Sequence, residues 1–171
     1  MTELPAGDLG YLVITAVDHG PPFAERIFQR KYRASAPDFP LHFVTFWRTP
    51  DDAFVPVHYT HFTRFGESLL IGGSCTDGDV LRRMPPEQQA GLHALGGPMY
   101  LTVRYALARL EGDSDATFGH CGDARSFSVL QRVGFERVPG YAYLIVRWHR
   151  RDIEDWRQRA MIAKADAIGP F

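Results

Sequence analysis

Short runs of β-branched and aromatic residues recur along the chain and predict strands. These runs are residues 10–17, 41–48, 54–64, 67–75, 116–121, 136–139 and 141–148. The turn residues Thr49-Pro50-Asp51-Asp52 separate the second run from the third, and Gly66 separates the third from the fourth. Short connections of this kind predict an antiparallel meander in the middle of the chain.

Apolar residues at helical spacing fill the intervals between these strands. The predicted helices cover residues 23–33, 86–95, 99–111, the segment that follows Asp123, and residues 152–165. Asp123 belongs to a residue type that caps helix N-termini, and Gly134 to the type that most often ends a helix. No internal repeat and no linker interrupts this order of strands and helices.

These elements predict one α+β domain over residues 1–171. Its centre is a mostly antiparallel mixed sheet of about seven strands flanked by helices. Two features extend this plan. One is an extended loop with a short helix at 78–97, and the other is an added C-terminal helix at 152–165.

Composition and charge narrow the class of protein. The chain has 171 residues, of which 45% are apolar and 23% charged, as in an average globular domain. Nineteen Lys and Arg against twenty Asp and Glu give a net charge of −1, which argues against a nucleic-acid partner. Two cysteines are too few for a disulfide framework. With neither a signal peptide nor a membrane span in the sequence, a soluble cytoplasmic protein is expected.

The segment 122–135, GDARSFSVLQRVGF, resembles the late segment of the GNAT N-acyltransferase superfamily. Asp123 and Ser126 stand where that family commonly has Asn and Ala, and Val133-Gly134-Phe135 reproduces its Gly-Phe ending. The strand at 67–75 is similar to the strand that precedes the family's cofactor loop. The order of elements also matches: strand, helix, three-strand meander, helix, strand, helix, two strands. The resemblance implies a GNAT-like acyl-CoA N-acyltransferase fold.

The same resemblance implies a reaction and its partners. The protein is expected to move an acyl group from a thioester to an amine of a small molecule. The donor is an acyl-CoA or the phosphopantetheine of an acyl carrier protein, and that carrier protein is then a further expected partner. The predicted last helix, with Ile153 and Trp156, either covers the open side of the sheet or forms the seam of a homodimer. The donor's arm pairs with strand backbone, where glycine allows close approach. The residues assigned to the donor are Gly73, Ser74, Cys75, Arg82, Arg83, Gly96, Gly97 and Asp123.

Two positions depart from the family pattern. Pro98 follows Gly96-Gly97 and has no N–H to offer to a pyrophosphate. Leu130 stands where the family often has the tyrosine that protonates the leaving thiolate. Two functions therefore stay open, an active N-acyltransferase and a catalytically silent GNAT-like binding or interaction module.

Acyl transfer to an amine needs a base for the ammonium proton and an acid for the departing thiolate. His120 ends a predicted strand and is the first candidate for the base, because histidine titrates near neutral pH. His58 is a second pocket candidate, and Tyr141 is a candidate for the missing acid. A structural hydrogen bond is the alternative for His120, and a place in the core is the alternative for Tyr141. Cys75 and Cys121 are expected to be core thiols, and no metal site is expected.

Overall fold

The computed structural model describes residues 10–38 and 41–170. These residues form two compact units, each of which packs mainly within itself. The first unit holds the described residues up to His61 together with Gly73–Ala106, and the second holds Phe62–Gly72 together with the described residues from Leu107 onward. The expectation of a single domain stays a prediction.

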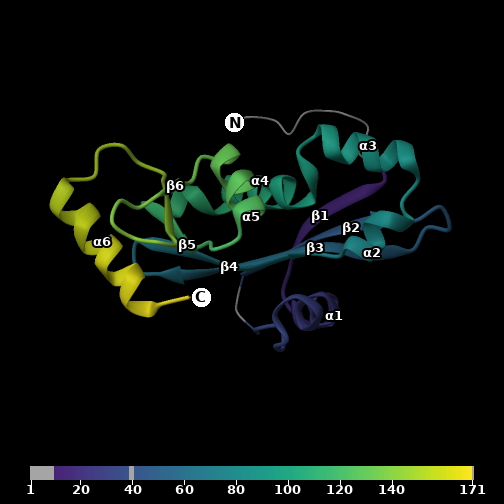
Figure 1. The fold of residues 1–171 in the computed structure, drawn as a ribbon, viewed down its shortest axis with the longest axis horizontal. Coiled ribbons are helices and arrows are strands. Elements are labelled where there is room, and N and C mark those ends of the chain that lie inside the picture. Colours follow the sequence, from purple (N-terminus) through teal and green to yellow (C-terminus); the bar gives the residue numbers. More distant parts are fainter. Residues whose placement is uncertain (1–9, 39–40, 171) are drawn as a thin grey trace. The chain divides into compact units, whose positions relative to one another are not determined.

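Seven strands in the described residues form one sheet in the order β1-β2-β3-β4-β5-β7-β6 (Figure 1). The strands are β1 Leu12–Val17, β2 Leu41–Arg48, β3 Phe54–Phe65, β4 Ser68–Thr76, β5 Ala116–His120, β6 Glu136–Arg137 and β7 Leu144–Trp148. The pairs β1–β2, β5–β7 and β6–β7 are antiparallel, whereas β4 and β5 are parallel. The predicted α+β class with a mostly antiparallel mixed sheet is confirmed.

Helices from two parts of the sequence cover the strands of the first unit. They are α1 Pro21–Tyr32, α2 Gly78–Arg83, α3 Pro86–Ala94 and the first part of α4 Gly97–Leu110. Ile27 and Phe28 of α1 pack with Tyr59, while Leu92 and Leu101 of α3 and α4 belong to a separate apolar cluster. Figure 1 accordingly shows α1 and α3 on opposite sides of β1–β3.

The long connection after β4 contains two helices, where the sequence predicted one. The additional helix is α2, which begins after Asp77. One carboxylate oxygen of Asp77 accepts hydrogen bonds from the backbone N–H groups of Asp79 and Val80, at 2.9 and 3.2 Å. This N-cap stabilises a helix of six residues that is too short for a periodic pattern to predict.

The second unit is built on β5, which pairs with β4 on one side and with β7 on the other. Helix α6 Asp155–Ile168 covers its sheet: Met161 and Ala165 are buried in one cluster with Phe118 and Val146. The remaining helices of this unit are the end of α4, the 3₁₀ turn Glu111–Asp113 and α5 Ala124–Arg132. In the described residues, no helix is long and apolar enough to cross a membrane.

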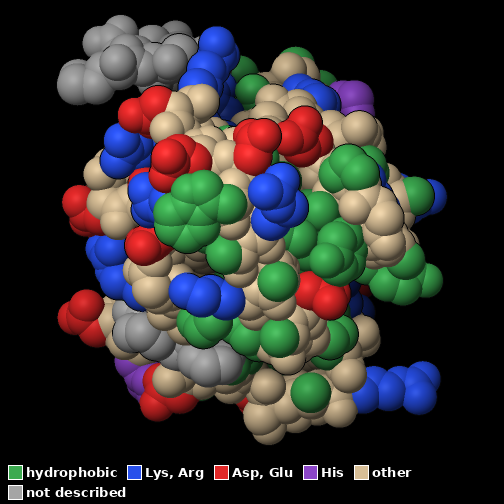
Figure 2. All heavy atoms as spheres, turned by 90° about the vertical axis from the view of Figure 1, so that its left-hand side faces the viewer, with side chains coloured by type: hydrophobic (Ala, Val, Ile, Leu, Met, Phe, Trp, Pro, Cys, Tyr) green, Lys and Arg blue, Asp and Glu red, His purple; other side chains and the backbone are tan. Residues whose placement is uncertain are grey.

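The inner face of α6 is apolar, whereas its outer face carries charged side chains. Figure 2 shows acidic and basic side chains interspersed on this side of the molecule, with hydrophobic groups between them. Trp156 is 60% exposed there, and its indole N–H donates to Glu154 at 2.9 Å. The mixture of charges gives no large field of one sign on this face.

Three histidines are buried in the first unit, on β2 and β3. His42 Nδ1 lies 2.8 Å from the Tyr59 hydroxyl, and His58 Nδ1 lies 2.7 Å from Thr76 Oγ1. Among the described residues, the Nε2 atoms of His42 and His58 have no hydrogen-bond partner. Burial lowers the pKa of His58 to about 3 and that of His61 to about 4, so both rings are neutral at pH 7.

These buried rings predict a loss of stability in weak acid. An unfolded histidine binds a proton as the pH falls through its ordinary pKa of 6.5, whereas folded His58 and His61 bind one only near 3 and 4. The free energy of unfolding should therefore fall below pH 6.5, by up to about 1.4 kcal/mol per pH unit for each histidine. Urea unfolding at a series of pH values measures this slope.

The matched variants are His58→Gln, which removes one buried ring, and His93→Gln, which changes an exposed histidine on α3. We expect His58→Gln to flatten the pH slope and His93→Gln to leave it unchanged. Equal slopes in all three proteins would contradict the assignment.

Candidate functional site

Strand β4 pairs with β5 along only part of its length. Four of its residues pair in parallel with β5, from Ser68 with Ala116 to Ile71 with Gly119, and the strand then continues to Thr76. At Gly73 the backbone has a φ of +49°, in the left-handed region that favours glycine. We call residues 73–76 the distal half of β4. It belongs to the first unit.

The distal half of β4 lies directly against side chains of that unit. A Cβ atom added at Gly73 would come within 2.5 Å of His61 Cε1 and 2.7 Å of Phe28 Cε2. The glycine is therefore needed for packing as well as for its backbone conformation. Cys75 is buried, and burial raises the pKa of its thiol to about 12, so the thiol stays protonated and is a poor nucleophile.

Helix α1 holds the distal half of β4 through one carbonyl group. Lys31 Nζ and the Tyr32 hydroxyl each donate to the Ser74 backbone oxygen at 2.8 Å. The Ser74 hydroxyl lies 2.7 Å from Thr60 Oγ1. Sequence reasoning missed the first two contacts, because Lys31 and Ser74 are 43 positions apart and no local motif links them.

A cavity of about 200 Å³ opens where β4 ends. It is lined by Ile27, Arg30, Lys31, Thr76, Asp77 and Gly78. Asp77 is 3% exposed, and Arg26 forms an ion pair with it, while Arg30 pairs with Asp79. We call this space the α1–β4 cavity.

The start of α4 carries the predicted pyrophosphate residues. Gly96 and Gly97 have φ values of +101° and +86°, and a Cβ at Gly97 would meet no atom within 4 Å. The first turn of a helix has N–H groups without an intrahelical partner, and its partial positive charge favours anions. Pro98 removes one of these donors. Arg82 and Arg83 are exposed in the last turn of α2, where Arg82 pairs with Asp79.

Three of the predicted residues belong to the second unit. His120 ends β5 after Gly119, and burial lowers the pKa of its imidazole below the ordinary 6.5. Asp123 caps α5 as predicted, accepting from the Ser126 N–H at 2.6 Å. Tyr141 is half-buried and packs against the apolar cluster of that unit. His58, in the first unit, is fully buried. A substrate that arrives from solvent cannot easily exchange a proton with it, so a positioning role suits it better.

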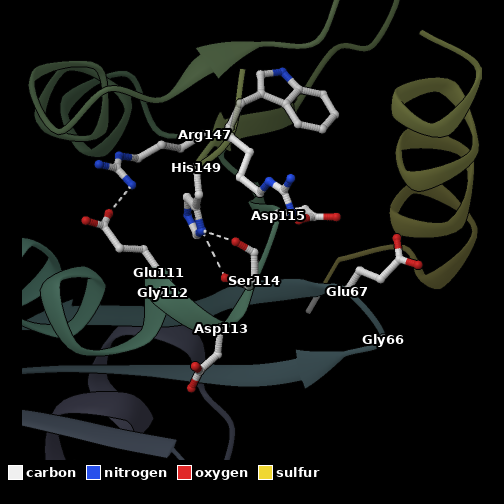
Figure 3. A pocket seen from close by; sticks show the side chains of 11 residues that line it. Gly66, Glu67, Glu111, Gly112, Asp113, Ser114, Asp115, Arg147 and His149 are labelled. Atoms are coloured by element: carbon white, nitrogen blue, oxygen red, sulfur yellow. Dashed lines mark hydrogen bonds and ion pairs between the residues drawn. The ribbon is translucent and has the colours of Figure 1, made fainter. Parts of the chain in front are cut away.

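The second unit has a cavity of its own, of about 790 Å³ (Figure 3). Its lining residues are Gly66, Glu67, Glu111, Gly112, Asp113, Ser114, Asp115, Arg147, Trp148, His149 and Arg150. Figure 3 shows that Arg147 pairs with Glu111, at 2.6 Å, and that His149 turns its ring to Ser114. Arg157 reaches Glu67 and Asp115 at 2.9 and 3.0 Å.

This larger cavity is a poor match for a thioester donor. Each of its carboxylates and guanidinium groups already has an ionic partner, which for Glu67 and Asp113 lies outside the lining, so few charges remain for a ligand. It also lies where β4 and β5 begin, whereas ligands of parallel strands bind at the carboxyl ends. Within the described residues, no three His, Cys, Asp or Glu side chains are grouped as a metal site.

Two glycines provide a test of the packing at β4. Gly66 and Gly73 both have a left-handed φ, of +57° and +49°, but only Gly73 has atoms close to the position of a Cβ. Gly66→Ala should lower the free energy of unfolding by about 1 kcal/mol through backbone strain alone. Gly73→Ala should cost about 1–3 kcal/mol more, because His61 and Phe28 must move. Chemical unfolding of both variants measures the difference, and equal losses would show that the packing at Gly73 is not tight.

Comparison with known proteins gives matches only at the level of structure. No family model and no curated protein matches the sequence. The Escherichia coli ribosomal-protein-S18-alanine N-acetyltransferase matches with a TM-score of 0.56 and 12% identity, over 84% of this chain and 97% of that one. A candidate acetyltransferase from Pyrococcus horikoshii matches with a TM-score of 0.52 and 13% identity, over 75% of this chain and 44% of that one.

The expected partners need correction. Among the matched structures are AtaT complexed with acetyl-methionyl-tRNAfMet, at a TM-score of 0.44 and 13% identity over 80% of this chain and 94% of that one, and a KacTA-DNA complex. The S18-alanine enzyme is named for a protein substrate. Net charge alone therefore does not exclude nucleic acid, so that expectation is corrected, and the small-molecule acceptor is not confirmed.

Strand order, the parallel β4–β5 pair and the structural matches agree with one another. They confirm the resemblance that was based on segment 122–135 and on the order of elements. At 12–13% identity, the likeness establishes the architecture of the chain. The chain has the fold of the GNAT N-acetyltransferases.

Proposed function

We propose that this protein transfers an acyl group from a coenzyme A thioester to an amine. The nitrogen attacks the thioester carbonyl carbon, a C–N bond forms, the C–S bond breaks, the nitrogen loses a proton and the thiolate gains one. The observation that carries the proposal is strand β4, which leaves its parallel partner after Ile71 and continues through Gly73 to Thr76.

The distal half of β4 is the proposed contact for the donor's amide-bearing arm, through Gly73, Ser74 and Cys75. An extended amide chain can pair with strand backbone as an added strand would. The Ser74 carbonyl already accepts from Lys31 and Tyr32. An arriving amide therefore uses the other backbone groups of this segment or displaces one of these two donors.

The N-terminus of α4 is the proposed contact for the donor's pyrophosphate. Open space around Gly97 fits this assignment, as does the partial positive charge of a helix that is 14 residues long. Arg82 and Arg83 are exposed cations on the same connection and are retained as proposed phosphate contacts. Asp123 caps α5, and we propose no charge contact for it with an anionic donor.

His120 is the proposed base. Its lowered pKa leaves the imidazole neutral at pH 7 and able to accept the proton of the attacking amine. Leu130 of α5 is 4% exposed and has no proton to give, so the thiolate must receive its proton elsewhere. Tyr141 remains the proposed source. If no residue supplies this proton, the second candidate function follows: a module that binds the thioester without turnover.

Charge at α4 provides the test of donor binding. Gly97→Asn and Gly97→Asp add side chains of equal size, and both residue types tolerate a left-handed φ. We expect the Asp variant to bind acetyl-CoA about tenfold more weakly than the Asn variant, because a carboxylate repels the pyrophosphate. Isothermal titration measures both constants. Equal affinities would remove α4 from the donor site.

Turnover separates an enzyme from a silent module. His120→Gln should lower kcat about a hundredfold and leave the Kd for acetyl-CoA unchanged. The wild-type rate should fall in acid as His120 gains a proton, with a midpoint below pH 6.5 because its pKa is lowered. The assay measures product formation as the free thiol that is released, with a mixture of primary amines as acceptors. Binding of acetyl-CoA without any thiol release would favour the silent module.

A further inference from the structure

We propose that the α1–β4 cavity binds a carboxylate or phosphate group of the acyl acceptor. The inference rests on the proposed function, because it assigns the cavity to the molecule that receives the acyl group. Three properties of the cavity support it: its charge, its hydrogen-bond donors and its size.

The charges around the cavity do not cancel. Arg26 pairs with Asp77, Arg30 lies 3.7 Å from Asp77 and pairs with Asp79, and Arg82 also pairs with Asp79. In the described part of the chain, Lys31 has no carboxylate within ion-pair distance. Among the residues that line the cavity there are therefore two cations, Arg30 and Lys31, and one carboxylate, Asp77, and the excess positive charge favours an anion.

Lys31 has hydrogen-bond donors to spare. Its ammonium group gives one of three N–H bonds to the Ser74 carbonyl at 2.8 Å, and two remain. The residue lines the cavity and is exposed. The bond to Ser74 fixes the ammonium beside the distal half of β4, which is the proposed donor contact.

Thr76 offers a second donor through the buried His58. The His58 ring is fully buried, and its Nδ1 lies 2.7 Å from Thr76 Oγ1, a residue of the cavity lining. When Nδ1 carries the ring proton, His58 donates to Thr76, and the threonine hydroxyl is free to donate to a ligand. The buried imidazole then acts as a positioning residue for that hydroxyl.

The size of the cavity limits the ligand to an end group. Its volume of about 200 Å³ equals the liquid volume of about six or seven water molecules. A carboxylate or a phosphate fits this space, and the rest of the acceptor would extend from its open side. Gly78 has no side chain to narrow the space further.

The chain contains two lysines, Lys31 and Lys164, and both are exposed. This allows a test that does not depend on activity. The folded, full-length protein is treated with an amine-acylating reagent, and mass spectrometry follows the labelling of each lysine. Inorganic phosphate or succinate should slow labelling of Lys31, by about tenfold at ten times its Kd, and leave Lys164 on α6 unchanged. The more effective anion identifies the group.

Matched variants test the assigned contacts. Thr76→Val removes the hydroxyl at nearly constant volume and should weaken protection of Lys31, whereas Thr63→Val on β3 should not. Arg30→Gln is a second variant that lowers the positive charge without touching the buried core. Wild-type protection in both Thr76→Val and Arg30→Gln would overturn the proposal, as would the failure of both anions to protect Lys31.

A competition experiment separates the acceptor from the donor. With saturating acetyl-CoA present, phosphate or succinate should still bind with its original affinity, measured by titration calorimetry. Competition between acetyl-CoA and the anion would assign the cavity to the donor's phosphates and overturn the proposal. Failure of the proposed function has a different signature, because acetyl-CoA would then show neither binding nor thiol release while the anion still protects Lys31.

Discussion

The left-handed backbone at Gly73 is the constraint on which the candidate site depends. Without a side chain at this position, His61 and Phe28 pack directly against the strand, and β4 continues to Thr76. The Ser74 carbonyl then meets Lys31 and Tyr32, which fixes the end of α1 beside the strand. The α1–β4 cavity follows from this contact, because Lys31 is part of its lining.

The buried histidines and the two cavities have different energetic characters. An unpaired buried polar atom costs about 1–3 kcal/mol, so the Nε2 atoms of His42 and His58, which have no partner among the described residues, lower the free energy of unfolding. His58 is compensated in part by its bond to Thr76, at the edge of a cavity with excess positive charge. In the larger cavity the charged side chains form ion pairs, so their charges largely cancel, and partly exposed pairs of this kind contribute little to the free energy of unfolding.

Hydrophobic periodicity and capping residues predicted most helices and strands of this fold, whereas they did not predict the tertiary contacts. The Asp123 cap was predicted because a capping side chain acts within three residues, and the structure confirms it. Helix α2 was missed, although Asp77 was a signal for its N-cap. The hydrogen bond from Lys31 to the Ser74 carbonyl joins residues 43 positions apart, and neither residue type nor spacing predicts such a pair. Hydrophobic periodicity reports which face is buried, and it does not report which strand carbonyl a helix will reach.

The most direct test of the account is hydrogen–deuterium exchange of the full chain with and without acetyl-CoA. Pairing of the donor's arm with β4 predicts slower exchange of the amides at 73–76. Slower exchange only at 111–115 and 147–150 would place the ligand in the larger cavity, and no change at any amide would mean that the fold has lost its donor. Either of these two results would contradict the account.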